Sequence, residues 1–105
     1  MLVSTEFTDR SGVKQRPAVI ISSDRYNAQS PDIMIASITG NLSAIRHPGD
    51  HLLDHWQDAG LLRPSMVHAK IATVETSIVG RRLGRLANGD LAALDLGLRE
   101  ALDLA

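Results

Sequence analysis

The fold is decided by the stretch Arg16-Pro17-Ala18-Val19-Ile20-Ile21-Ser22-Ser23, in which four aliphatic residues follow a proline. Such a short apolar run is typical of a strand that is buried on both faces. Proline suits the start of that strand because it has no N–H to donate to a neighbouring strand. Residues 32–39 contain a second run of this kind, so we predict two core strands, at about 16–23 and 32–39.

Weaker patterns on either side predict the rest of a small barrel. Alternating or continuous apolar residues indicate further strands at about 1–8, 50–53 and 65–74. Short strands that are joined by short turns are typical of a β-barrel. Residues 54–59, which precede Gly60, are consistent with a single helical turn.

The C-terminal segment has a different period. Leucine and alanine recur there every three or four residues, which predicts an amphipathic helix over about 88–103, with Asn88 as its N-cap and Asp90 in its first turn. The apolar stripe of this helix needs a partner, which is either the barrel or another subunit. We therefore predict a mainly β (α+β) fold in a single domain, 1–105, with a barrel over about 1–86 and the helix after it.

Length and composition exclude several classes of protein. The chain has 105 residues, of which 44% are apolar and none is cysteine. It is long enough for one core, and no apolar run approaches the roughly 20 residues of a membrane span. The lack of cysteine excludes a disulfide scaffold, a thiolate zinc site and a cysteine nucleophile. Because no signal segment opens the chain, we expect a cytoplasmic protein whose whole chain is folded.

Charge is distributed unevenly along the chain. The net charge is −1, which argues against a uniformly basic surface. Arginine and lysine are nevertheless concentrated in residues 10–46 and 63–85, whereas acidic residues dominate residues 50–58 and the C-terminal helix. One face is therefore suited to a polar anionic partner, and ordinary solvated charge is the alternative explanation.

The histidines do not form a recognisable metal site. His51 and His55 have the i, i+4 spacing of two ligands on one helix, but the residues between them fit a strand better and no third ligand accompanies them. The sequence also lacks the glycine patterns of nucleotide-binding loops and the Gly-x-Ser-x-Gly motif. We predict no metal ion and no cofactor.

Two polar residues stand at the ends of the core strands. Arg16 immediately precedes the first apolar run, and Thr39 is the last residue of the second, before Gly40 and Asn41. If the two strands are neighbours, a guanidinium and a hydroxyl meet at one edge of the barrel, where both donate well to a phosphate. The alternatives are a surface ion pair for Arg16 and an ordinary strand position for Thr39.

Four segments of the chain together resemble one protein family. They are Lys14-Gln15-Arg16-Pro17-Ala18-Val19-Ile20-Ile21-Ser22-Ser23-Asp24, Ala36-Ser37-Ile38-Thr39-Gly40-Asn41, Ala59-Gly60-Leu61-Leu62-Arg63-Pro64-Ser65-Met66-Val67 and Leu83-Gly84-Arg85-Leu86. In order and spacing they are similar to the PemK/MazF toxins of type II toxin–antitoxin systems, over nearly the whole chain. The resemblance implies an SH3-like β-barrel with a C-terminal helix, a homodimer, and a cognate antitoxin that occludes the RNA groove.

The resemblance also implies a reaction. The family's toxins are metal-independent endoribonucleases that cut single-stranded RNA at short sequences, by attack of the 2′-hydroxyl on the adjacent phosphorus. A 2′,3′-cyclic phosphate and a 5′-hydroxyl result, and DNA is not cleaved because it lacks the nucleophile. By position, Arg16 matches the family's catalytic arginine and Thr39 its catalytic serine or threonine. The residues that we expect to bind RNA are Lys14, Gln15, Asn41, His68 and Lys70, and His68 is also a candidate general base.

Two other functions are compatible with the same fold. Gyrase-poisoning toxins look alike in fold but bind a protein, through a C-terminal tail that contains tryptophan, whereas this chain ends in Leu102-Asp103-Leu104-Ala105. A catalytically silent dimer that only binds an antitoxin is the remaining alternative. RNA cleavage by the wild-type protein, and its loss on Arg16→Ala, distinguish the nuclease from both.

Overall fold

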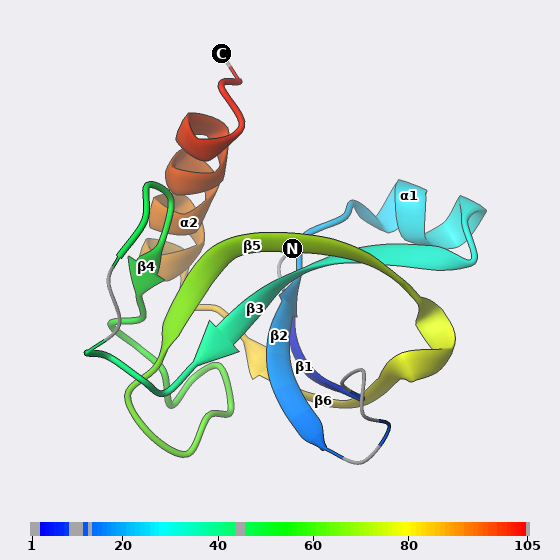
Figure 1. Cartoon of the computed structure of the whole chain (residues 1–105), viewed down its shortest axis with the longest axis horizontal. Coiled ribbons are helices and arrows are strands. Elements are labelled where there is room, and N and C mark those ends of the chain that lie inside the picture. The colour runs from blue at the N-terminus through cyan, green and yellow to red at the C-terminus, as the bar shows by residue number, and fades with distance from the viewer. Residues whose placement is uncertain (1–2, 9–11, 13, 44–45, 105) are drawn as a thin grey trace.

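The computed structural model describes residues 3–8, 12, 14–43 and 46–104. Six strands form one antiparallel sheet in the order β4-β5-β3-β2-β1-β6, and this sheet is strongly curled (Figure 1). The strands are β1 (Val3–Thr8), β2 (Gln15–Ile20), β3 (Asp32–Thr39), β4 (His51–Leu52), β5 (Met66–Glu75) and β6 (Val79–Arg85). The helices are α1 (Asp24–Gln29), the single 3-10 turn η1 (Thr76–Ile78) and α2 (Asn88–Ala101). The predicted mainly β fold with a C-terminal helix is confirmed.

Two apolar clusters lie on opposite faces of the sheet. Because side chains alternate along a strand, Val19 belongs to one cluster and its neighbour Ala18 to the other. The first cluster lies beneath α2, whose Leu94 is fully buried in it. The second contains Ile33 and Ile35, and Phe7 of β1 and Val79 of β6 pack against it. The prediction that β2 and β3 are core strands is therefore confirmed.

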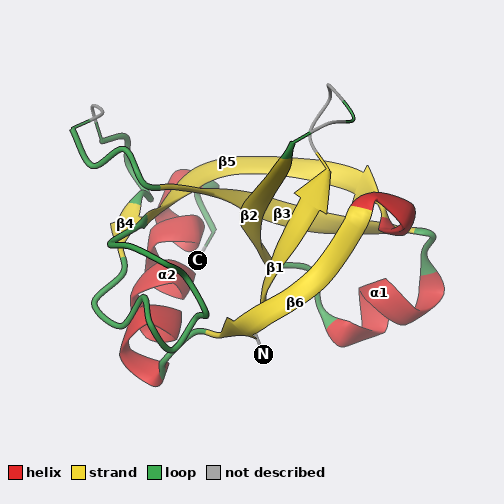
Figure 2. Ribbon diagram, turned by 90° about the horizontal axis from the view of Figure 1, so that it is seen from below, coloured by secondary structure: helices red, strands yellow, loops and turns green. Residues whose placement is uncertain are grey.

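The two longer helices lie at opposite ends of the sheet (Figure 2). The apolar stripe of α2 packs on the barrel through Leu94 and Leu98, so the first of the two predicted partners is the one observed. The prediction that Asn88 caps α2 is wrong. Ala87 is the extended residue before the first turn and makes no side-chain cap, while Asn88 is already helical. None of the helices in the described part of the chain is long and apolar enough to cross a membrane.

Several elements differ from the prediction. β6 is not predicted because its sequence, Val79 to Arg85, contains three arginines and two glycines; it forms because its backbone pairs with β1. The short helix α1 is also not predicted, and begins where the Ser23 hydroxyl accepts a hydrogen bond from the Tyr26 N–H. Residues 54–60 form successive turns rather than a helix. The predicted start of the first strand, residues 1–2, lies outside the described residues.

The pairing of β5 with β3 is interrupted once. Ala36 of β3 pairs with Ile71, but Ile38 pairs with Val67, so β5 has two extra residues within this interval. Such a bulge disrupts the ladder locally and bends the strand. Met66 and Val67, at the start of β5, are both fully buried.

Candidate functional site

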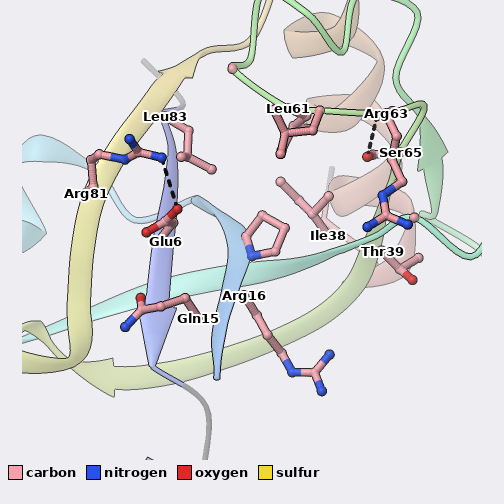
Figure 3. Close-up of a pocket in the computed structure, with 14 residues that line it drawn as sticks. Glu6, Gln15, Arg16, Ile38, Thr39, Leu61, Arg63, Ser65, Arg81 and Leu83 are labelled. Carbon is pink, nitrogen blue, oxygen red and sulfur yellow. Dashed lines mark hydrogen bonds and ion pairs between the residues drawn. The ribbon is translucent and has the colours of Figure 1, made fainter. Parts of the chain in front are cut away.

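A pocket of about 410 Å³ opens where β2 begins and β3 ends. Its walls come from β1, β2, β3 and β6 and from the connection between β4 and β5 (Figure 3). Apolar side chains such as Ile38, Leu61 and Leu83 form part of it. The polar side chains that line it are those of Glu6, Gln15, Arg16, Thr39, Arg63, Ser65 and Arg81.

Arg16 and Thr39 lie at facing strand ends beside the pocket. The pair between β2 and β3 that lies nearest this end is Ala18 with Ser37, and the same register continued by two residues places Arg16 opposite Thr39. Facing residues of an antiparallel pair project from the same side of the sheet. Both residues line the pocket, and Figure 3 shows the Arg16 side chain extending away from the wall that carries Ile38 and Leu61. That the two side chains meet at one ligand stays a prediction.

A local hydrogen bond orients the Thr39 hydroxyl. Its oxygen accepts from the N–H of Asn41 at 3.1 Å, in the turn that follows β3. This bond uses a lone pair of the oxygen and leaves the O–H as a donor. The side chain of Asn41 is engaged separately, because its carbonyl oxygen accepts from the hydroxyl of Ser43 at 2.7 Å. The bond from Asn41 therefore fixes the Thr39 oxygen within the turn that follows β3.

The charge of the pocket lining is positive. Three arginines, Arg16, Arg63 and Arg81, line it, and Glu6 is the one carboxylate among the described lining residues. The Glu6 carboxylate is paired with the Arg81 guanidinium at 3.2 Å. A pocket with this balance favours an anionic ligand over a cationic one.

The other predicted RNA-binding residues lie in three different places. Gln15 lines the pocket, and Lys14 and Asn41 are exposed beside residues that line it. His68 and Lys70, on β5, do not line it. The His68 ring lies 3.2 Å from the Asp50 carboxylate and its side chain is only 16% exposed. The structure therefore does not bring His68, the candidate base, to the pocket.

One wall of the pocket comes from the second half of residues 53–65, a segment that we call the pocket loop. Its two ends are joined because the Leu53 N–H donates to the Ser65 carbonyl at 3.0 Å. Its centre is joined to β1, since the buried Ser4 hydroxyl donates to the Ala59 carbonyl. Leu53 and Ala59 are themselves buried in the first apolar cluster. The loop is thus packed as part of the barrel.

Asp90 of α2 fixes the start of the pocket loop. One of its carboxylate oxygens accepts from the Asp54 N–H and lies 2.8 Å from the His51 ring, and the other accepts from the His55 N–H. The side chain is fully buried. Burial raises the pKa of Asp90, but the hydrogen bonds from Asp54, His51 and His55 outweigh it, so the pKa lies below the ordinary 3.8.

Asp50 makes a similar anchor beside β5. Its carboxylate accepts from the backbone N–H groups of His47 and Ala69 and contacts the His68 ring. Burial raises the pKa of Asp50, and these hydrogen bonds lower it to a net value below the ordinary one. Within the described residues, no three histidine, aspartate or glutamate side chains are grouped so that they could hold a metal ion.

Gly60 holds the centre of the pocket loop against β6. Its φ is +74°, and a Cβ built on it would lie 2.0 Å from the Leu83 carbonyl oxygen. We expect Gly60→Ala to destabilise the protein by about 2–4 kcal/mol, because it adds a backbone clash to a strained φ. Thermal unfolding measures this. Gly89→Ala is the matched control: it lies in α2 with no neighbour within 4 Å, so its melting temperature should not fall.

Comparison with known proteins gives the family. The family described as "PemK-like, MazF-like toxin of type II toxin-antitoxin system" matches residues 2–102. The chain belongs to this toxin family. Endoribonuclease MazF6 of Mycobacterium tuberculosis is 34% identical to this toxin over 93 residues, which cover 87% of the chain and 81% of that relative. Endoribonuclease MazF9 of the same species is 33% identical, with 86% and 80% covered.

Solved structures show the same fold. The Mycobacterium tuberculosis toxin MazF-mt6 superimposes with a TM-score of 0.81 at 22% identity, and 98% of each chain is covered. A mycobacterial endoribonuclease in complex with its cognate antitoxin gives a TM-score of 0.79 at 21% identity, with 98% of this toxin and 93% of that chain covered. These identities support the fold alone, whereas the resemblance inferred from the sequence is confirmed by the family match.

Several pocket residues were not predicted from the sequence as site residues. Arg63 and Ser65 lie within a segment that carries the family resemblance, but their position beside Thr39 follows from the path of the pocket loop. Glu6 and Arg81 are 75 residues apart and meet because β1 pairs with β6. Their opposite charges are compatible with an ion pair. The sequence could not predict this pair, because it did not predict that β6 forms and pairs with β1.

Proposed function

We propose that this toxin is an endoribonuclease that cleaves single-stranded RNA by transesterification, with Arg16 and Thr39 as its catalytic residues. The observation that carries the proposal is that an arginine and a threonine from facing strand ends line one positively charged pocket. The relatives named as endoribonucleases support it. We place its action in the cytoplasm, where its RNA substrates are found.

The proposed reaction balances without an added reactant. The 2′-hydroxyl oxygen forms a bond to phosphorus, and the bond between phosphorus and the 5′-oxygen of the next nucleotide breaks. The 2′-hydroxyl loses one proton and the leaving 5′-oxygen gains one. The products are a 2′,3′-cyclic phosphate and a 5′-hydroxyl. DNA has no 2′-hydroxyl and is therefore not a substrate.

The two residues have different tasks in this reaction. Negative charge develops on the phosphoryl oxygens, and the Arg16 guanidinium donates to them as a planar fork. Thr39 donates its O–H to the same phosphate and holds it in line for attack. Because these two groups supply the stabilisation, the reaction needs no metal ion or cofactor.

We expect a single 2′-deoxy substitution at the cleavage site to abolish cutting there, because it removes the nucleophile. Long single-stranded RNA is first incubated with the toxin, and the fragment ends are mapped and analysed for 5′-hydroxyl and 2′,3′-cyclic phosphate groups. The substitution is then placed at the mapped site, with a neighbouring 2′-deoxy position as the control. Cleavage that persists at the substituted site, or fragments with 5′-phosphates, would refute the mechanism.

We also propose that the toxin is a homodimer and that a cognate antitoxin inhibits it. The family assignment supports an antitoxin partner. Among the structural neighbours, a MazE-MazF structure from Deinococcus radiodurans has a TM-score of 0.75 at 19% identity, and 98% of this toxin and 93% of that chain are covered. An antitoxin segment that lies across the Arg16 pocket would exclude RNA from it.

The two alternative functions make different predictions. A toxin that only binds a protein, such as gyrase, or a silent protein that only binds an antitoxin, needs no arginine and threonine at one pocket. Either alternative would be favoured if the folded wild-type protein left single-stranded RNA intact over a range of sequences.

A further inference from the structure

Arg63 lies against the backbone that follows Thr39. A Cβ built on Gly40 would lie 2.9 Å from Cδ and 3.3 Å from Nε of Arg63. The stem of the arginine therefore rests on Gly40, and a glycine at this position is what leaves room for it. Figure 3 shows the Arg63 and Thr39 side chains next to each other on the same wall of the pocket.

The backbone of Arg63 is fixed while its side chain is exposed. Its carbonyl accepts from the Ser65 hydroxyl at 2.9 Å, and Ser65 is itself only 4% exposed. The Ser65 carbonyl in turn accepts from the Leu53 N–H, which joins the two ends of the pocket loop. A guanidinium that is held at its stem and exposed at its end loses little conformational entropy when it binds an anion.

The charges around the pocket favour an anion at Arg63. Among the described lining residues, Glu6 is the one carboxylate, and it is paired with Arg81 of β6. The pocket loop supplies Arg63, and β2 supplies Arg16. The end of β3, which includes Thr39 and Gly40, lines the pocket beside Arg63. The pocket loop and β2 therefore each contribute one arginine to the lining, and the two arginines could bind two different phosphates.

We propose that Arg63 binds the phosphate adjacent to the scissile one and so sets the position of RNA relative to Arg16 and Thr39. This inference rests on the proposed endoribonuclease function. A single strand of RNA presents one phosphate per nucleotide, so a strand held by Thr39 and Arg16 at one phosphate presents its neighbour to a second cation. Arg63 is a substrate-binding residue in this account and takes no part in the chemical step.

The test separates binding from chemistry. The probe is a short single-stranded RNA centred on the mapped cleavage site and made uncleavable by one 2′-deoxy position. We expect Arg63→Gln to weaken its binding about tenfold and to reduce the slope of log K against log salt by roughly 0.7, the value for one phosphate contact in a single strand. With saturating cleavable RNA, the single-turnover rate should stay within about threefold of the wild type.

Two further variants control for indirect effects. Arg25→Gln removes an exposed arginine of α1, at the opposite end of the sheet from α2, and should change neither binding nor the salt slope. Gly40→Ala keeps every polar group of the pocket but displaces the Arg63 stem, so it should weaken binding in the same direction. Adding Gly40→Ala to Arg63→Gln should then have little further effect, because both changes act through one side chain.

The outcomes distinguish this inference from the proposed function. If the wild type cuts RNA but Arg63→Gln binds the probe with unchanged affinity and salt slope, Arg63 does not bind a phosphate. If Arg63→Gln binds normally but its single-turnover rate falls a hundredfold, Arg63 acts on the scissile phosphate and the assignment to the adjacent one is wrong. If the wild type cuts no RNA, the proposed function fails, whatever Arg63 does.

Discussion

Arg16→Ala is expected to reduce the single-turnover rate of RNA cleavage by a factor of about 100–1,000 and to leave the fold intact. The rate falls because a donor that is preorganised on developing phosphoryl charge contributes about 3–4 kcal/mol to the stabilisation of the transition state. The fold persists because Arg16 is exposed at the start of β2, where truncation removes no core packing. Cleavage of the mapped RNA site and thermal unfolding are the two measurements.

Two matched variants show whether the effect belongs to this guanidinium. Arg16→Lys keeps a positive charge but loses the planar fork, so it should recover only a small part of the rate. Arg25→Ala removes an exposed arginine on α1 and should cut at the wild-type rate. An Arg16→Ala protein that produces the wild-type fragments at the wild-type rate would remove Arg16 from the mechanism.

Thr39→Val is expected to have a smaller effect than Arg16→Ala. It removes one neutral donor and also the acceptor of the Asn41 N–H, while the β-branched shape at the end of β3 is preserved. We expect the rate to fall about tenfold to a hundredfold at unchanged melting temperature. The same cleavage assay measures this, and a rate equal to that of the wild type would show that the hydroxyl is not used.

The register that places Arg16 opposite Thr39 was predictable from the sequence for a physical reason. Each residue directly adjoins a short aliphatic run, and the two runs are neighbouring core strands whose antiparallel register is fixed by the burial of residues such as Val19 and Ala36. A slip by one residue would reverse the faces of these core residues. Because burial of the core residues fixes the register of the two strands, it also fixes which polar residues face each other at the strand ends.

The rest of the pocket depends on contacts that local patterns do not reveal. Arg63 lies against Gly40 because the pocket loop is folded back on the barrel, through Gly60 against β6 and Ser4 against Ala59. β6 is also hidden in the sequence, because its arginines obscure the strand alternation. The packing of the pocket loop and the pairing of β6 both depend on contacts between residues far apart in the sequence. Neither is indicated by a hydrophobic period in the local sequence.

The histidines illustrate the same limit. The i, i+4 spacing of His51 and His55 is compatible with a metal site when it is considered by itself. In the fold, the His51 ring and the His55 N–H both approach one buried carboxylate, that of Asp90. Asp90 lies 35 residues beyond His55, and its first-turn position predicted only a favourable interaction with the helix N-terminus.

Asp90→Ala is expected to be strongly destabilising, although Asp90 is a polar side chain. The substitution leaves the N–H groups of Asp54 and His55 without their acceptor and removes the partner of the His51 ring. Because hydrogen bonds to a charged group are worth about 1.5–3 kcal/mol each and the vacated donors partly rehydrate, we expect a loss of about 3 kcal/mol. For a chain of this size the melting temperature should fall by roughly 10–20 °C.

Asp95→Ala is the matched control on the same helix. Asp95 pairs with Arg99 one turn further on, and both side chains are more than half exposed, so this surface pair contributes little. Its loss should change the stability by less than about 0.5 kcal/mol.

Asp90→Asn keeps the shape of the side chain and tests the contribution of its charge. It should be almost as unstable as Asp90→Ala, because one backbone N–H would then face an amide NH₂ donor.

The pH dependence of stability gives an independent test of the Asp90 carboxylate. Its pKa is lowered in the folded state, so its stabilisation is fully present above the ordinary value of 3.8 and is lost as the pH falls through the lower folded value. Wild-type stability should therefore decline in acid more steeply than that of Asp90→Ala. Asp50, whose pKa is also lowered, maintains a residual decline in the variant. Equal acid slopes for the two proteins would contradict the role of Asp90, because protonation of this carboxylate would then carry no cost to the fold.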